Sequence, residues 1–147
     1  MTVRAILDTK GHHILTVEPE AKLSAAVKIL GERKIGAVLV MSNGGVEGIL
    51  SERDIVREAA RDEKFFVRVV ADLMTRDVIT GQPHDDLLSV AHTMTERRIR
   101  HLPVVDKGRL IGMVSIGDVV KAQRDHYQGE VDTLQTQLLA DERGRAR

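Results

Sequence analysis

Residues 16–56 read TVEPEAKLSAAVKILGERKIGAVLVMSNGGVEGILSERDIV, and residues 80–120 read TGQPHDDLLSVAHTMTERRIRHLPVVDKGRLIGMVSIGDVV. The two stretches align without a gap. Their identical pairs include Pro19/Pro83, Gly48/Gly112 and Asp54/Asp118. The likeness also extends upstream, where residues 3–7 resemble residues 70–74. Self-similarity at a fixed period is the signature of a repeated structural unit. The chain therefore contains one unit twice, and this duplication decides its fold.

Each copy carries the same order of predicted elements. After a proline in each copy, apolar residues recur at three- and four-residue spacing, which is typical of an amphipathic helix. Short apolar runs follow at 37–41 and 46–50, and the Asn-Gly turn signal between them predicts a β-hairpin. The second copy has the equivalent runs at 102–105 and 110–114. A second amphipathic helix ends each copy, so the unit is β-α-β-β-α.

A single unit of this kind cannot cover both faces of its small sheet. Two copies can do so by packing sheet to sheet around a pseudo-twofold axis. We therefore expect an α/β (α+β) fold forming one module, since 147 residues is the size of one compact domain. The expected boundaries are 2–62 for the first repeat, 63–69 for the connection, 70–125 for the second repeat, and 126–147 for a C-terminal helix with a frayed tail.

Two segments lie outside the repeated pattern. The connection contains Phe65 and Phe66, which we expect to anchor it by packing. A C-terminal helix is predicted over 121–140, followed by a frayed tail over 141–147. One face of this helix carries an apolar stripe made of Tyr127, Val131, Leu134 and Leu138. The stripe is too short for a free coiled coil, so we expect it to pack on its own domain or on a second subunit of a homodimer.

Charge and composition argue against several classes of protein. Lys plus Arg equals Asp plus Glu at 22 each, so no net field draws the chain to nucleic acid or to an anionic membrane. The sequence has one Tyr, two Phe and no Trp, which leaves few rings for stacking bases. It has no cysteine, which fits a reducing compartment. We expect a cytoplasmic protein that binds neither nucleic acid nor a membrane.

Catalytic and metal-binding patterns are also missing from the sequence. The six histidines have no repeated spacing to other ligand-type residues. Neither a Ser-His-Asp order nor a glycine-rich phosphate loop stands out. We therefore expect no metal site and no enzymatic activity.

The most specific signal is a repeated string of the form Gly-h-h-Ser-x-x-Asp, where h is apolar, at 48–54 and 112–118. Each string ends a predicted strand and opens a predicted helix, where free N–H groups and the helix dipole favour phosphate. The aspartate, an acceptor when ionised, suits the paired hydroxyls of a ribose. Ser-x-x-Asp is also a capping box that satisfies the first N–H groups of a helix. Both interpretations are open from the residues alone.

The proline-led helices, the segments 35–37 and 99–105, and both Gly-h-h-Ser-x-x-Asp strings resemble the pattern of cystathionine-β-synthase (CBS) domains over roughly residues 2–125. The resemblance implies a disc-like pair of domains with two clefts related by the pseudo-twofold axis. In many family members these clefts hold AMP, ADP, ATP, NAD or S-adenosylmethionine. Each cleft is generally assembled from both copies, with the ribose-binding aspartate from one and the base-binding segment from the other.

Of the two clefts that the resemblance implies, the first has more positively charged residues than the second. Two roles are open for Arg100, phosphate ligand or solvated surface arginine. Two are also open for His101, phosphate ligand or structural hydrogen-bonding group. The residues assigned to this cleft are Ser51, Arg53, Asp54, Thr80, Ile99, Arg100 and His101.

The second cleft is poorer in charge. Gly36 and Ala37 stand where the first cleft has Arg100 and His101, and Gly117 stands where the first copy has Arg53. The residues assigned to this cleft are Ser115, Asp118, Thr16, Ile35, Gly36 and Ala37.

The function that follows is a non-enzymatic regulatory sensor. We expect it to bind an adenine nucleotide, AMP first, with NAD, ATP, ADP and S-adenosylmethionine as alternatives, and to signal to a regulated protein that the sequence does not name. NAD is a strong alternative to AMP as the ligand, because its second phosphate and ribose can extend toward Arg53 and Arg100. The rival is a ligand-free structural module whose Ser-x-x-Asp strings are only helix caps.

Overall fold

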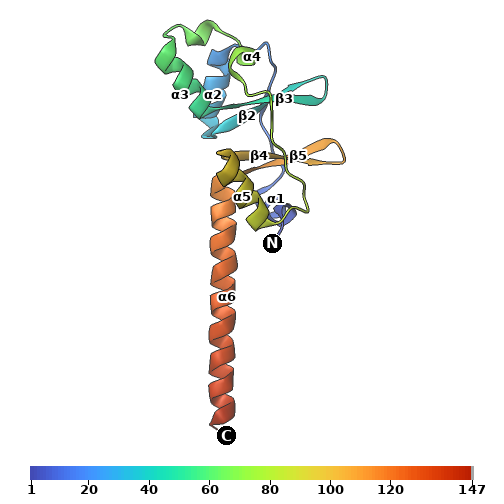
Figure 1. Ribbon diagram of the computed structural model, residues 1–147, viewed down its shortest axis with the longest axis vertical. Helices are drawn as coiled ribbons and strands as arrows, with labels where there is room; N and C mark the ends of the chain where they lie inside the picture. The colour runs from blue at the N-terminus through green and yellow to red at the C-terminus, as the bar shows by residue number, and fades with distance from the viewer. Residues whose placement is uncertain (147) are drawn as a thin grey trace.

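The computed structural model of the protein describes residues 1–146 and consists of two similar halves and one projecting helix (Figure 1). The two small sheets lie in the middle of the globular part, and the helices lie on the outer sides. One sheet has three strands in the order β1-β2-β3, and the other has two, β4-β5. The predicted mixed α/β fold with two repeated units is confirmed.

The elements follow the predicted order in the first half, whereas in the second half the predicted first strand is reduced to an isolated parallel bridge between Gly81 and Val104. The chain begins with α1 (Val3–Lys10). The first half then contains β1 (Thr16–Val17), α2 (Leu23–Arg33), β2 (Ala37–Ser42), β3 (Gly45–Ser51), α3 (Glu52–Arg61) and the short 3-10 helix η1 (Phe65–Val67). The second half contains α4 (Val70–Leu73), α5 (Leu87–Arg97), β4 (His101–Asp106), β5 (Arg109–Ser115) and α6 (Ile116–Arg145).

The two hairpins have the same turn and the same register. Asn43 and Gly44 have φ values of 52° and 78°, and Lys107 and Gly108 have φ values of 50° and 78°. Two successive left-handed residues suit the tight turns that join twisted antiparallel strands. The register places Ala37 opposite Ser51 in the first half, and the equivalent residues of the second half are paired in the same way. The serine that begins each Ser-x-x-Asp string therefore lies opposite the first residue of the hairpin, Ala37 in β2 or His101 in β4.

The short helices α1 and α4 are exchanged between the two halves. Val70 and Met74 belong to the core of the first half, and Val3, Ile6 and Leu7 belong to the core of the second half. The exchange requires glycine at one place in each hairpin. A Cβ atom at Gly48 would lie 2.7 Å from Met74 Sδ, and one at Gly112 would lie 2.6 Å from Leu7 Cδ2. This crossing brings Lys10, the last residue of α1, beside Met113 and Asp118 of the second half.

The connection between the halves differs in part from expectation. Phe65 is buried and packs in the first core, as predicted. Phe66 is 45 % exposed, so the prediction that it is a second packing anchor is wrong. Its ring instead lies against that of Phe65, with centroids 4.0 Å apart. One buried ring is enough to hold the short η1 turn on the domain.

Helix α6 is longer and more isolated than expected. It runs to Arg145, so the prediction of a frayed tail from residue 141 is wrong for the part that the structure describes. Arg143 and Arg145 lie in the last turn, where positive charge complements the helix dipole. The apolar stripe does not pack on its own domain, because the helix projects away from it (Figure 1). Within residues 1–146, no helix has both the length and the apolar character that crossing a membrane needs.

Candidate functional site

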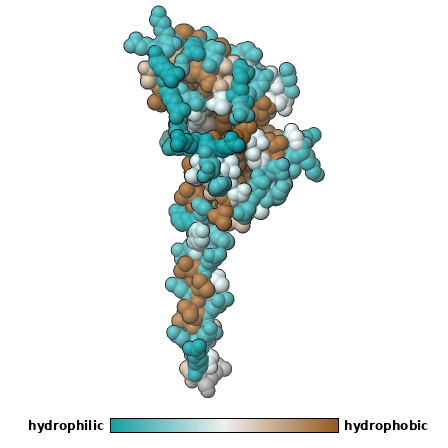
Figure 2. Space-filling view, viewed as in Figure 1, coloured by the Kyte–Doolittle hydropathy of each residue, from teal (hydrophilic) through white to brown (hydrophobic). Residues whose placement is uncertain are grey.

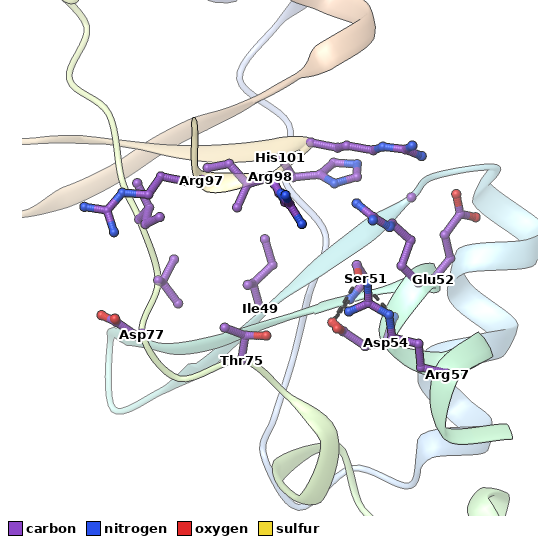
Figure 3. A pocket seen from close by; sticks show the side chains of 16 residues that line it. Ile49, Ser51, Glu52, Asp54, Arg57, Thr75, Asp77, Arg97, Arg98 and His101 are labelled. Atoms are coloured by element: carbon purple, nitrogen blue, oxygen red, sulfur yellow. Dashed lines mark hydrogen bonds between the residues drawn. The ribbon is translucent and has the colours of Figure 1, made fainter. Parts of the chain in front are cut away.

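Both Ser-x-x-Asp strings form complete capping boxes. Asp54 N–H donates to Ser51 Oγ at 3.3 Å, and Asp54 Oδ2 accepts from Ser51 N–H at 3.0 Å. Ser115 and Asp118 repeat this arrangement, with distances of 3.2 and 2.8 Å. Both strings therefore act as helix caps, as the capping interpretation predicts. This capping does not exclude a ligand role, because the bonds within the first box use only Oδ2 of Asp54 and leave Oδ1 to other partners (Figure 3).

A cleft of about 420 Å³ lies in front of the first capping box. This volume is within the usual range for small-molecule sites. Its walls come from both halves, because Ser51 and Asp54 lie on one side and the segment from the end of α5 to His101 lies on the other (Figure 3). The residues that line it are Gly36, Ile49, Ser51, Glu52, Arg53, Asp54, Arg57, Thr75, Asp77, Val78, Ile79, Arg97, Arg98, Ile99, Arg100 and His101.

The sequence-predicted residues of the first cleft come together with one exception. Ser51, Arg53 and Asp54 from the first half and Ile99, Arg100 and His101 from the second all line it. Thr80 is exposed and is not among the lining residues, although the two residues before it are. Gly36, which was assigned to the second cleft, lines this one instead. The structure therefore brings the Ser51–Asp54 segment of the first half and residues 99–101 of the second half to one cleft.

The cleft is more cationic than the sequence indicated. Five arginines line it, against the carboxylates of Glu52, Asp54 and Asp77. Arg57, Arg97 and Arg98 were not predicted. Arg98 is the left-handed residue that ends α5, with a φ of 55°. The shared left-handed ends of α2 and α5 were not recognisable as ligand signals, because only the assembled pair shows which end faces the cleft.

Apolar side chains form the remaining wall. Ile49 lies between Ser51 and Thr75 in Figure 3, and Val78, Ile79 and Ile99 complete this surface. Thr75 is fixed there by two backbone hydrogen bonds with Ile49, of 3.0 and 2.9 Å. Flat aliphatic surfaces of this kind can hold a base ring without aromatic stacking. Sequence reasoning found only Ile99 among these residues.

His101 of the second half lies close to Gly36 of the first half. A Cβ atom at Gly36 would lie 2.8 Å from His101 Nε2, so only glycine leaves the imidazole its position. Burial lowers the pKa of His101 below its ordinary value of 6.5, and the positive charges of Lys10 and Arg100 act in the same direction, while Glu52 opposes them. The imidazole is therefore mainly neutral at pH 7, and the positive charge of the cleft comes from its arginines.

The second capping box has a different neighbour. Lys10, at the end of α1, places its Nζ 2.6 Å from Asp118 Oδ2 and 2.7 Å from the Met113 carbonyl oxygen. Burial alone would raise the pKa of Asp118. The hydrogen bonds from Lys10 and Ser115, together with the charge of Lys10, outweigh burial and hold this pKa below its ordinary value. The carboxylate that corresponds to Asp54 is thus already paired inside the chain.

The position of Lys10 matches that of Asp77 in the other half. Because residues 3–7 match residues 70–74, Lys10 matches Asp77 by the same offset, and Asp77 lines the first cleft. Where Thr75 N–H donates to the Ile49 carbonyl in the first half, Lys10 Nζ donates to the equivalent Met113 carbonyl in the second. The same place in the fold therefore holds an acid in one half and a base in the other.

The other residues assigned to the second cleft have partners of their own. Ala37 is buried in β2, Ile35 packs against the first core, and Thr16 is exposed in β1. No hydrogen bond or ion pair within residues 1–146 joins these three to Ser115 or Asp118. The described part of the chain also contains no group of three His, Cys, Asp or Glu residues that could hold a metal ion.

A duplicated β-α-β-β-α unit with a polar cleft between its copies defines a paired ligand-binding module. The CBS domain model matches the chain twice, over residues 3–61 and 70–125. These matches cover well over half of the chain. The protein belongs to the CBS domain family.

Known proteins similar to this chain include both solved structures and curated sequences. The CBS-domain containing protein ATU1752 from Agrobacterium tumefaciens is 40 % identical, with a TM-score of 0.81, over 83 % of this chain and 92 % of that one. The CBS domain-containing protein YhcV of Bacillus subtilis is 28 % identical over 81 % of this chain and 85 % of its own length. The chain spans only 56 % of another, longer curated relative.

A third similar protein was solved with ligands. The CBS domain pair of protein MJ0100, in complex with 5′-methylthioadenosine and S-adenosyl-L-methionine, is 26 % identical, with a TM-score of 0.75. The similarity covers 86 % of this chain and 98 % of that one. Both of those ligands contain an adenosyl group.

Proposed function

We propose that this protein is a non-catalytic regulatory sensor that binds one adenine nucleotide per chain in the first cleft. The observation that carries the proposal is the asymmetry of the two capping boxes. Asp54 faces an open cleft lined by five arginines, whereas Asp118 is paired with Lys10. The ligands of the MJ0100 domain pair support an adenosyl group as the part recognised.

The geometry suggests a role for each wall of the cleft. Asp54 has a carboxylate oxygen that the helix cap does not use, and we assign it to the two ribose hydroxyls, because an ionised carboxylate accepts from both. Ile49 and Ile99 would enclose the adenine. The arginines at the ends of α5 and in α3 would bind phosphate through charge-assisted hydrogen bonds.

The charge of the cleft favours a ligand that bears phosphate. AMP remains the first candidate, with ADP, ATP and NAD as alternatives, and Arg53 and Arg100 would hold additional phosphate groups. S-adenosylmethionine carries a sulfonium cation, which five lining arginines disfavour. A ligand of this class should therefore bind through its phosphates as well as its nucleoside.

Binding regulates another molecule only if a partner distinguishes the free from the bound state. We propose a cytoplasmic homodimer that reports ligand occupancy to a protein partner and that binds neither nucleic acid nor a membrane. Because the cleft is built from both halves, a ligand would bias how the halves sit against each other. This supplies the change that a partner can detect.

The rival function is a structural module without a ligand. It is favoured by one specific observation, the completeness of both capping boxes, which by itself explains Ser51 and Asp54. The two functions differ in what the carboxylates do beyond capping.

Isothermal titration of nucleotide-stripped protein with AMP, ADP, ATP, NAD and S-adenosylmethionine tests the proposal. Asp54→Asn should weaken nucleotide binding by roughly 10- to 100-fold, since charge-assisted hydrogen bonds contribute about 1.5–3 kcal/mol. Asp118→Asn makes the same chemical change to an equivalent cap and should leave the affinity within about twofold. Heat from none of the five ligands, with unchanged melting temperature, would favour the structural module.

A further inference from the structure

The C-terminal two thirds of α6 has no packing partner within its own chain. The last buried residue of the helix is Val119, and every residue from Arg124 to Ala146 is exposed. Gly129 and Gly144 also lie in this segment and weaken it as a helix. A solvated helix of this length is marginal without tertiary support. The segment therefore calls for a partner that buries one of its faces.

One face of the segment is apolar. Figure 2 shows apolar side chains in brown along the projecting part of α6. Four exposed residues of this segment follow one another at four-, three- and four-residue spacing, which is the seam of a two-stranded coiled coil. They are Tyr127, Val131, Leu134 and Leu138, exposed by 55, 46, 59 and 63 %.

We infer that α6 pairs with α6 of a second copy of this chain, in antiparallel orientation, about a twofold axis between Val131 and Leu134. In this register Val131 faces Leu134 of the partner subunit and Tyr127 faces Leu138 of the partner subunit. Each contact occurs twice by symmetry. The pairing deepens the proposed homodimer by identifying its interface, and it does not depend on nucleotide binding.

Charge complementarity selects the antiparallel orientation. The seam position before Tyr127 is Arg124, and the one after Leu138 is Asp141. The axis that aligns the apolar residues also brings Arg124 against Asp141 of the partner subunit. At the flanking positions it brings Lys121 against Glu142 of the partner subunit. Opposite charges therefore meet at both ends of the seam.

A parallel pair would bring like charges together. Arg124 would face Arg124 of the partner subunit, and Asp141 would face Asp141 of the partner subunit. Among the described residues, the one ion pair of Arg124 is with its neighbour Asp125, at 3.5 Å, and its side chain is 72 % exposed. It is thus free to turn toward a partner helix. Like charges at seam positions oppose the parallel alignment.

The inferred interface lies beyond the part of the chain that the family shares. The second match to the CBS domain model ends at residue 125. The similar Agrobacterium structure covers 83 % of this chain but 92 % of its own. The projecting part of α6 is therefore an addition to the paired module, with a sequence suited to self-association.

Sedimentation equilibrium of the full chain tests the pairing. Asp141→Arg should raise the dimer dissociation constant at least tenfold, because it places arginine against Arg124 of the partner subunit. The matched control is Asp132→Arg, the same change on the same exposed helix but away from the seam, and it should leave the constant within about threefold. The double variant Arg124→Asp with Asp141→Arg should restore dimerisation, and circular dichroism checks that each variant retains its helix.

The outcomes separate the two proposals. A dimer that is indifferent to Asp141→Arg overturns the α6 pairing and leaves the homodimer to another surface. A monomer at all concentrations overturns both. The orientation is tested by a spin label at Arg143→Cys, which is specific because the chain has no cysteine. Antiparallel helices separate the two labels by roughly 30 Å along the axis, at 1.5 Å per residue, whereas parallel helices place them side by side.

Discussion

The two capping boxes of this protein have the same residue types and the same capping hydrogen bonds, but they face different surroundings. Each consists of a serine that caps a helix and an aspartate that closes the box, with hydrogen bonds of 2.8 to 3.3 Å. Asp54 faces a cleft of about 420 Å³, and Asp118 faces the ammonium group of Lys10. A duplicated binding motif therefore need not give two binding sites.

The difference arises from one position outside the motif. Lys10 matches Asp77 by the sequence offset of the repeat, but Lys10 is the last residue of α1, whereas Asp77 lies four residues beyond the end of α4. Asp77 carries the same charge as Asp54 and cannot pair with it, whereas Lys10 pairs with Asp118, the aspartate that a ribose would need. Of the two copies of the motif, one thus faces an open cleft and the other has its aspartate paired with a lysine.

After Asp54→Asn, the next largest effect on nucleotide binding is expected from Arg98→Gln. This change removes a cation from the open cleft and should weaken binding of AMP by about 10-fold, in keeping with the loss of one charge-assisted hydrogen bond. Lys34→Gln is the matched control. Lys34 ends α2 with a φ of 53°, as Arg98 ends α5 with 55°, but it does not line the cleft. Equal losses in the two variants, measured by titration calorimetry, would contradict the assignment.

A second change should make Asp118 available to a ligand by removing its ion pair with Lys10. Lys10→Met removes the ammonium group from Asp118 while keeping a side chain of similar length. We expect the stoichiometry of nucleotide binding to rise from one to two per chain. The second site should be about 10-fold weaker, because Gly117 stands in place of Arg53 and there is no counterpart of Arg100. An unchanged stoichiometry of one would show that Lys10 does not keep a ligand from Asp118.

The smallest effect concerns stability and its dependence on pH. The Lys10–Asp118 pair lowers the pKa of Asp118, so it stabilises the fold above the ordinary value of 3.8 and loses this contribution as the pH falls through the lowered value. Lys10 is more than one third exposed, so we expect Lys10→Met to cost only about 0.5–1 kcal/mol at pH 7. Urea unfolding at pH 7 and below pH 3.8 measures the difference in the free energy of unfolding between the unmodified protein and Lys10→Met. This difference should become smaller in acid. A difference that is constant with pH would contradict this role of the pair.

Much of the fold was predictable because the chain repeats itself. The Asn43-Gly44 and Lys107-Gly108 turns fix the hairpins locally, and the Ser-x-x-Asp strings fix where the following helices begin. Each of these signals acts over a few residues, and the structure confirms each one. The family pattern also predicts that Asp54 and the segment around His101 lie in one cleft, and both line the same cleft.

The decisive asymmetry was not predictable from the same signals. The contact between Lys10 and Asp118 joins residues 108 positions apart and exists only because α1 packs on the second half. Arg97 and Arg98 face the cleft only when the two halves are assembled. The isolation of α6 likewise depends on the direction in which the helix leaves the domain. All three features are tertiary, and no local pattern encodes them.

A crystal structure of the protein with its tightest-binding nucleotide tests the central claim most directly. The account predicts one nucleotide per chain, with its ribose hydroxyls on Asp54, its phosphates among the arginines of the first cleft, and Lys10 still paired with Asp118. A nucleotide bound at Asp118 with Lys10 displaced, or equal occupancy of both clefts, would contradict it.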